Sequence, residues 1–298
     1  MNADVMTTAS EAADLPRRSR SRFRPSPWHL VLIPITFVLL VPLLWMLATS
    51  LETEAETHRF PPVLVPRSLQ WHNYADAWRA APFGSFLLNS LIVSVLTVIS
   101  TLVLCSLAGY AFARVRFAGR GLLFIVLMAS LMVPFQVTMI PEFLIVKWLG
   151  LHVWTQLGID HLGALIVPNL VTAFGIFFLR QFFLTIPIEL EEAARMDGTS
   201  RLGVLIKIVL PLSLPALATL AVLTFLDSWN SFLWPLIVVN SEPHMTLPLG
   251  LTTFQGSHNT QWSLLMAANV VSLLPMLVVF FAAQRYFVRS VAGTGLKG

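Results

Sequence analysis

Six long apolar stretches constrain the fold of this 298-residue chain more than any other feature. They cover residues 28–50, 86–113, 122–140, 162–183, 208–239 and 263–287. A bilayer core about 30 Å thick is crossed by about 20 apolar residues in an α-helix, so each stretch is long enough to span it. The fifth stretch is overlong and contains three prolines, so its ends are the least defined. The pattern predicts an all-α membrane protein with six transmembrane helices.

The composition agrees with a lipid-facing surface. Hydrophobic residues make up 56% of the chain and charged residues only 11%, against about 25% in soluble domains. The net charge of +4 does not indicate a nucleic-acid partner, because the basic residues lie at the edges of the apolar stretches. The single cysteine, Cys105, lies inside an apolar stretch and is expected to be a small packing residue.

The distribution of lysine and arginine predicts the orientation of the chain. With the N-terminus placed in the cytoplasm, 15 of the 19 lysines and arginines fall on the cytoplasmic side, as the positive-inside rule requires. Both termini are then cytoplasmic, which agrees with an even number of spans. The first stretch follows Arg17-Arg18 and could be taken for a cleavable signal, but it is longer than the apolar region of signal peptides. We therefore expect an uncleaved anchor.

The cytoplasmic connection between the fourth and fifth stretches has an unusual pattern. Pro187 can open a helix, and the glutamates that follow it suit the positive end of the helix dipole. Asp197-Gly198 indicates a turn, and Ser200 can cap a second helix over residues 202–208. The residues predict two short helices joined by a glycine turn. By themselves they fit a docking surface and an amphipathic loop resting on the membrane equally well.

This connection resembles the EAA loop of ABC importer permeases in both residues and spacing. Three residues separate Glu192-Ala193-Ala194 from Gly198, and nine residues separate Gly198 from Ile208. One further residue separates Ile208 from Leu210-Pro211. In that family the loop forms a coupling helix that seats in a cleft of the ATPase subunit. The resemblance therefore implies a role in ATPase coupling for Glu192, Ala193, Ala194, Asp197, Gly198, Ile208, Leu210 and Pro211.

Residues 88–91, 107–120 and 229–235 resemble the carbohydrate branch of the family. Residues 284–298 resemble the end of the second membrane subunit of maltose-type systems, and the resemblance as a whole covers residues 28–298. It implies the type I permease fold in the bacterial inner membrane, with a basic tail (1–27), a first helix and external loop (28–83), a permease core (84–288) and a cytoplasmic tail (289–298). The last of these would reach the ATPases through Gly293, Lys297 and Gly298.

The resemblance also implies the partners. These are a second permease subunit in a heterodimer, a dimer of ATP-binding subunits, an external solute-binding protein and a sugar. No G-x-x-x-x-G-K-[ST] phosphate loop occurs in the sequence, so ATP and magnesium are expected on the partner ATPase and no cofactor on this chain. Residues 293–298 fit G-x-G-x-x-G but lack the strand and helix that a dinucleotide loop needs. No metal-ligand pattern is present, and we expect no enzymatic activity.

A neutral polyol would need uncharged hydrogen-bonding groups and aromatic faces along its pathway. The candidates are Asn89, Gln136, Asn169, Trp229 and Asn230, with the adjacent pair Trp229-Asn230 favoured. Each can also hold helices together through hydrogen bonds, and for any single one of them this structural role is the favoured interpretation. Asp227, the only carboxylate well inside a stretch, either lines the pathway or is a hydrogen-bonded aspartate near a span end.

Two other functions stay open at this point. One is an importer of the same family for glycerol phosphate or another polyol, although no cluster of arginines in the stretches suggests an anion. The other is an ion-coupled secondary carrier. Such carriers usually use several ionisable residues within the membrane, and a single intramembrane aspartate is few for that role.

Overall fold

The structure is a computed structural model that describes residues 28–61, 65–256 and 260–294, with side chains as far as Gln284. Helices make up nearly all of its regular structure, and one isolated antiparallel bridge joins Gln255 to Thr260. The chain divides into two compact units, residues 1–45 and 46–298, which are described separately.

Most of α1 (His29–Thr49) belongs to the first unit. Its 21 residues contain no Asp, Glu, Lys or Arg, and its large apolar side chains are exposed around the helix. A helix that is apolar on all sides is typical of a membrane span.

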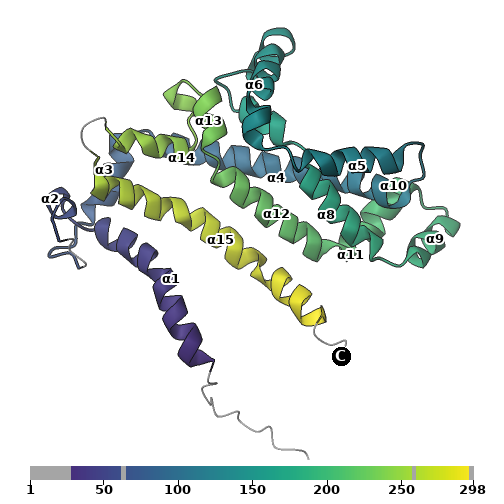
Figure 1. The fold of residues 1–298 in the computed structure, drawn as a ribbon, viewed down its shortest axis with the longest axis horizontal. Helices are drawn as coiled ribbons and strands as arrows, with labels where there is room; N and C mark the ends of the chain where they lie inside the picture. The colour runs from purple at the N-terminus through teal and green to yellow at the C-terminus, as the bar shows by residue number, and fades with distance from the viewer. Residues whose placement is uncertain (1–27, 62–64, 257–259, 295–298) are drawn as a thin grey trace, which may run out of the picture. The chain divides into compact units, whose positions relative to one another are not determined.

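The second unit is built around α4 (Phe83–Arg114), which packs against α8 (Ala173–Leu184) and α12 (Leu214–Trp229). The long helix α15 (Trp262–Thr294) lies beside α12 and also contacts α3 (His72–Ala80), as Figure 1 shows. The core between α4, α8 and α12 contains Cys105, Leu179 and Leu220, none more than 1% exposed. Burial of Cys105 agrees with the packing role expected for it.

Three unbroken helices in the described part of the chain are long and apolar enough to cross a membrane. They are His29–Thr49, Phe83–Arg114 and Trp262–Gln284. Three further candidates are pairs of helices that meet at a bend, so the described residues hold up to six crossings if each pair counts as one. The helical, multi-span character predicted from the sequence is thus present.

The third expected span, 122–140, is not one straight helix. The chain forms α5 (Arg120–Ser130), turns by 105° and continues as α6 (Phe135–His152). Pro134 stands at the turn with extended backbone angles, and a proline disfavours the helical conformation in the residue before it. The apolar composition of the stretch hid this break, because composition alone does not register a single proline.

The fifth expected span, 208–239, is also divided. A bend of 81° separates the segment Arg201–Leu212 from α12, and α12 ends at Trp229. A separate short helix, α13 (Leu233–Val238), follows it. The Ser213 hydroxyl donates to the Val209 carbonyl oxygen (2.7 Å) at the bend, where Pro211 and Pro215 interrupt the backbone hydrogen bonds.

The fourth expected span, 162–183, bends by only 42°. It consists of α7 (Gly163–Ile166), the turn η2 (Val167–Asn169) and α8. Thr172 opens α8 by accepting a hydrogen bond from the Gly175 amide (3.0 Å). The remaining short elements outside the 188–212 segment are α2 (Glu54–Thr57), η1 (Thr155–Leu157), η4 (Glu242–His244), α14 (Leu247–Gly250) and η5 (Leu251–Phe254).

Asp160 ties together two loops that are far apart in the sequence. Its Oδ1 atom accepts hydrogen bonds from the Asn240 amide (2.9 Å), the Ser241 amide (2.7 Å) and the Ser241 hydroxyl (2.9 Å). Partial burial tends to raise the pKa of the Asp160 carboxyl, but the hydrogen bonds from Ser241 and Asn240 outweigh it and hold that pKa below its usual value. The backbone of Asp160 has φ +63°, a conformation that Asp and Asn tolerate better than most residues.

We expect Asp160→Asn to loosen this junction, because asparagine keeps an acceptor oxygen and tolerates the backbone angle but loses the charge. In the parent protein the ionised carboxylate stabilises the folded state fully at pH values above about 3.9, the ordinary pKa of aspartate. This stabilisation is lost as the pH falls through the lowered pKa of Asp160 in the folded protein. At neutral pH, hydrogen exchange at Asn240 and Ser241 should speed up about tenfold in the variant. Equal exchange in the variant and the parent would contradict this role.

Candidate functional site

The segment 188–212 contains the two short helices that the sequence predicted. Helix α9 (Ile188–Met196) follows Pro187, and Gly198 has φ +83°, the left-handed conformation that favours glycine. The Ser200 hydroxyl accepts a hydrogen bond from the Gly203 amide (3.2 Å) and caps α10 (Arg201–Val204). This part of the prediction is confirmed.

The second helix is shorter than expected over 202–208. After α10 the chain widens into a π-helical turn, η3 (Leu205–Val209), before the short helix α11 (Leu210–Leu212). The Leu210 amide bonds back to the Leu205 carbonyl, five residues earlier. Pro211 has no N–H and its ring crowds the carbonyl four residues before it, and a wider turn relieves that crowding.

The two halves of the segment have different surroundings. Ile208 and Leu210 pack against the core, so this end is built into the second unit. Pro211, at the same end, is exposed. At the other end, Glu192, Ala193, Met196, Asp197 and Gly198 are among the exposed residues, while Ala194 is half-buried. Met196 is 85% exposed, so α9 presents an apolar side chain to its surroundings. The ATPase-coupling role of these residues stays a prediction.

One glutamate of α9 points inward and anchors the helix. Glu191 is 4% exposed and pairs with Arg114 at the end of α4, with Nε to Oε1 at 2.7 Å. The Tyr110 hydroxyl donates to the other Glu191 oxygen (3.0 Å). Arg114 also donates to the carbonyl oxygens of Phe183 (2.8 Å) and Ile186, at the C-terminal end of α8. This arginine therefore joins α4, α8 and α9.

Sequence reasoning missed this anchor. It placed Arg114 among the cytoplasmic charges that set topology, and it counted Glu191 only with the glutamates near the helix dipole. One available signal was the spacing of Tyr110 and Arg114, since residues four apart share a face at the end of a helix.

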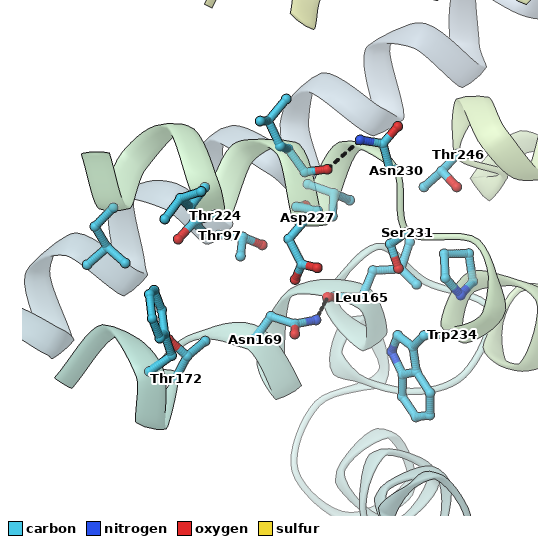
Figure 2. Close-up of a pocket in the computed structure, with 17 residues that line it drawn as sticks. Thr97, Leu165, Asn169, Thr172, Thr224, Asp227, Asn230, Ser231, Trp234 and Thr246 are labelled. Atoms are coloured by element: carbon cyan, nitrogen blue, oxygen red, sulfur yellow. Dashed lines mark hydrogen bonds between the residues drawn. The ribbon is translucent and has the colours of Figure 1, made fainter. Parts of the chain in front are cut away.

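A polar cavity of about 840 Å³ lies between α4, the α7–α8 region, α12 and α13. Figure 2 shows its lining residues. The polar side chains that line it are Thr97, Asn169, Thr172, Thr224, Asp227, Ser228, Asn230, Ser231 and Thr246. The structure thus brings Asn169 and Asn230, two of the five pathway candidates, into one cavity together with Asp227.

The other three pathway candidates lie elsewhere. Trp229 is 2% exposed, stacks on Phe225 and donates from Nε1 to the Ser272 carbonyl oxygen (3.2 Å), so it packs between α12 and α15. Asn89 donates from Nδ2 to the carbonyl oxygens of Pro243 (2.8 Å) and Met245 (2.9 Å). Gln136 is exposed in α6. The contacts of Asn89 and Trp229 are those of residues that hold helices and loops together.

The tail prediction falls mostly outside the described residues. Lys297 and Gly298 lie beyond them, and Gly293 lies in the last part of α15, where only the backbone is described. In the described part of the chain, no three His, Cys, Asp or Glu side chains are grouped so that they could hold a metal ion.

Comparison with known proteins identifies the family and the fold. Residues 104–293 match the family described as "binding-protein-dependent transport system inner membrane component". The arabinooligosaccharide transport permease AraQ of Halalkalibacterium halodurans is 35% identical over 89% of this chain and 93% of its own length. The sn-glycerol-3-phosphate transport permease UgpE of Pectobacterium atrosepticum is 35% identical over 88% of this chain and 94% of its own length.

A solved structure shows the same fold. A chain of a bacterial ABC transporter involved in the import of the acidic polysaccharide alginate superposes with a TM-score of 0.74, at 24% identity, over 88% of this chain and 98% of that chain.

These matches define a class of protein, the multi-pass transport permeases of the bacterial inner membrane. The chain belongs to the family of binding-protein-dependent transport system inner membrane components. Its fold is that of an ABC importer permease.

Proposed function

We propose that this chain is the permease subunit of an ATP-driven importer that moves a sugar across the cytoplasmic membrane. The observation that carries the proposal is α9, which is exposed on one face and anchored on the other to α4 and α8 through Glu191 and Arg114. An exposed, rigidly attached helix is what a separate motor subunit needs in order to move a membrane domain. The sugar substrate is supported by the arabinooligosaccharide permeases among the relatives.

The proposal includes six transmembrane helices with both termini in the cytoplasm. Each bent helix pair then counts as one span, and the positive-inside distribution of lysine and arginine supports the orientation. The partners are a second permease subunit in a heterodimer, two ATP-binding subunits that hold ATP and magnesium, and an external solute-binding protein. Segment 188–212 faces the ATP-binding subunits, and the tail with Gly293, Lys297 and Gly298 reaches toward them.

Alternating access follows from this arrangement. Closure of the ATP-binding subunits displaces α9, and the Arg114–Glu191 pair transmits the displacement to α4 and α8. These helices carry lining residues of the cavity, including Thr97 and Phe174, so their movement changes the access to it. The binding protein delivers the solute when the cavity opens outward. In this proposal ATP is hydrolysed on the ATP-binding subunits, because the sequence of this chain contains no phosphate loop.

A second candidate substrate is glycerol phosphate, because permeases of that transport system are among the relatives. Among the described residues that line the cavity there is no lysine, arginine or histidine, which favours a neutral solute. A stand-alone ion-coupled carrier would take up solute in proteoliposomes without any ATPase, and such uptake would overturn the proposal.

Gly198→Val tests the coupling role. The variant should insert normally in the membrane but lose most sugar uptake, because a β-branched residue cannot adopt the left-handed angle at φ +83° and α9 would be presented differently. The ratio of solute imported to ATP hydrolysed in the assembled transporter is the measurement.

Gly119→Val is the matched control. Gly119 has φ +80°, and, as at Gly198, an added Cβ would meet no atom within 4 Å, but it lies at the start of α5 outside segment 188–212. Both variants carry a similar backbone strain. The proposal requires the ratio to fall in Gly198→Val and to stay near the parent value in Gly119→Val. A normal ratio in both would count decisively against it.

A further inference from the structure

Asp227 is the one charged side chain in the described lining of the polar cavity. It is exposed to the cavity, and Figure 2 shows its carboxylate pointing from α12 toward Asn169. No hydrogen bond or ion pair joins this carboxylate to another described residue, so its oxygen atoms are open to whatever occupies the cavity. A charge without a protein partner inside a membrane domain points to a role in binding or selection.

The two asparagines of the cavity also present oxygen atoms. Asn169 donates from Nδ2 to the Leu165 carbonyl oxygen (3.1 Å), and Asn230 donates from Nδ2 to the Leu226 carbonyl oxygen (2.7 Å). Each amide thus commits an N–H to the backbone, and no hydrogen bond from a described residue reaches its side-chain oxygen. Together with Asp227 the cavity is rich in acceptors, and an acceptor-rich wall suits a solute that carries many donors.

Two buried hydroxyls supply a second, independent observation. Thr97 is 2% exposed and Thr246 is 5% exposed, both line the cavity, and neither hydroxyl has a hydrogen-bond partner among the described residues. Buried polar groups are normally hydrogen-bonded. The two hydroxyls leave hydrogen-bonding capacity unused at the cavity wall, which suits a polar occupant better than an apolar one.

We propose that Asp227 sets the substrate class of this permease, selecting neutral, hydroxyl-rich solutes and excluding anions such as phosphate esters and uronic acids. This inference rests on the proposed function. A carboxylate accepts hydrogen bonds from sugar hydroxyls but repels a second negative charge. At an effective dielectric constant of about 20, two unit charges about 8 Å apart change a binding equilibrium about 30-fold.

The charge effect is measured first without any transport. Cys105 is the only cysteine of the chain and is fully buried, so the parent protein is a blank for thiol labelling. In Ser231→Cys, placed in the cavity wall, cationic and anionic methanethiosulfonate reagents are compared in membranes that contain the assembled transporter. In Ser231→Cys the cationic reagent should react about tenfold or more faster than the anionic reagent. In the double variant that also carries Asp227→Asn, most of this difference in rate should be lost. An unchanged preference overturns the proposal.

The transport measurement compares a neutral oligosaccharide with its uronic-acid counterpart in the assembled transporter. Asp227→Asn should raise the ratio of anionic to neutral uptake about tenfold over that of the parent. The same binding protein is used with both transporters, so its own preference affects both ratios equally and cancels when they are compared. Asp76→Asn is the matched control, since Asp76 lies on α3 outside the cavity and should leave the ratio unchanged. An equal ratio in the parent and Asp227→Asn contradicts the selection.

Failure of the two claims can be told apart. Should the parent transporter import neither sugar, the proposed function fails, while the labelling preference at Ser231→Cys still decides whether Asp227 repels anions from the cavity. Should the sugar be imported but the labelling preference be insensitive to Asp227→Asn, the proposed function stands and the selective role of Asp227 is overturned.

Discussion

Arg114→Met should destabilise the folded permease by about 3–5 kcal/mol and abolish transport. The substitution leaves Glu191 buried without its cation, removes the printed donor to the Ile186 carbonyl oxygen, and leaves the Phe183 carbonyl oxygen with the Ile186 amide alone. Removing one partner of a buried ion pair is far more costly than removing both, because the remaining charge stays desolvated. Thermal unfolding of the purified protein in detergent, followed alongside sugar uptake, measures both effects.

Two further variants test the reason for this loss. Adding Glu191→Met to Arg114→Met should recover part of the stability, because no unpaired buried charge remains, but not the transport, because α9 is no longer tied to α4. Arg116→Met is the matched control, since Arg116 is exposed only two residues away. A loss of stability in Arg116→Met equal to that in Arg114→Met would show that the pair has no special role.

Gly109→Leu should push α4 away from α8 and lower both the yield and the stability of the folded protein. A Cβ atom at Gly109 would lie 3.2 Å from the Arg180 amide nitrogen and 3.3 Å from the Ile176 carbonyl oxygen, so a larger side chain meets helix backbone that cannot move aside. Small residues allow membrane helices to approach closely, and overpacking at such a contact costs about 1–3 kcal/mol or more. We expect a low yield of folded protein and a melting temperature lowered by several degrees.

Gly121→Leu is the control for this substitution. Gly121 also lies in a helix, α5, and a Cβ atom there would meet nothing within 4 Å. The two variants share the same chemical change and differ in whether the added side chain has space. If Gly121→Leu lowers the melting temperature as much as Gly109→Leu, the close approach of α4 and α8 does not explain the loss.

Local signals in the sequence were sufficient for the 188–212 segment. Pro187, the glycine turn and the Ser200 cap each act within a few residues of their own position, so the two short helices followed without knowledge of any other element. The same holds for the number and length of the apolar stretches, because a span is a property of one continuous run of residues. The bends in the third and fifth stretches were missed, since their apolar composition outweighed the few prolines that break them.

The sequence by itself determined that this protein is helical and apolar enough for several membrane crossings, and where a glycine turn divides its inner loop. Only the tertiary structure decided that Glu191 faces Arg114, that Asn169 and Asn230 share a cavity with Asp227, and that Trp229 and Asn89 do not. The physical reason is that these helices are apolar on nearly every side. Hydrophobic periodicity therefore does not mark the buried face, and the direction of each polar side chain is set by which helices pack together.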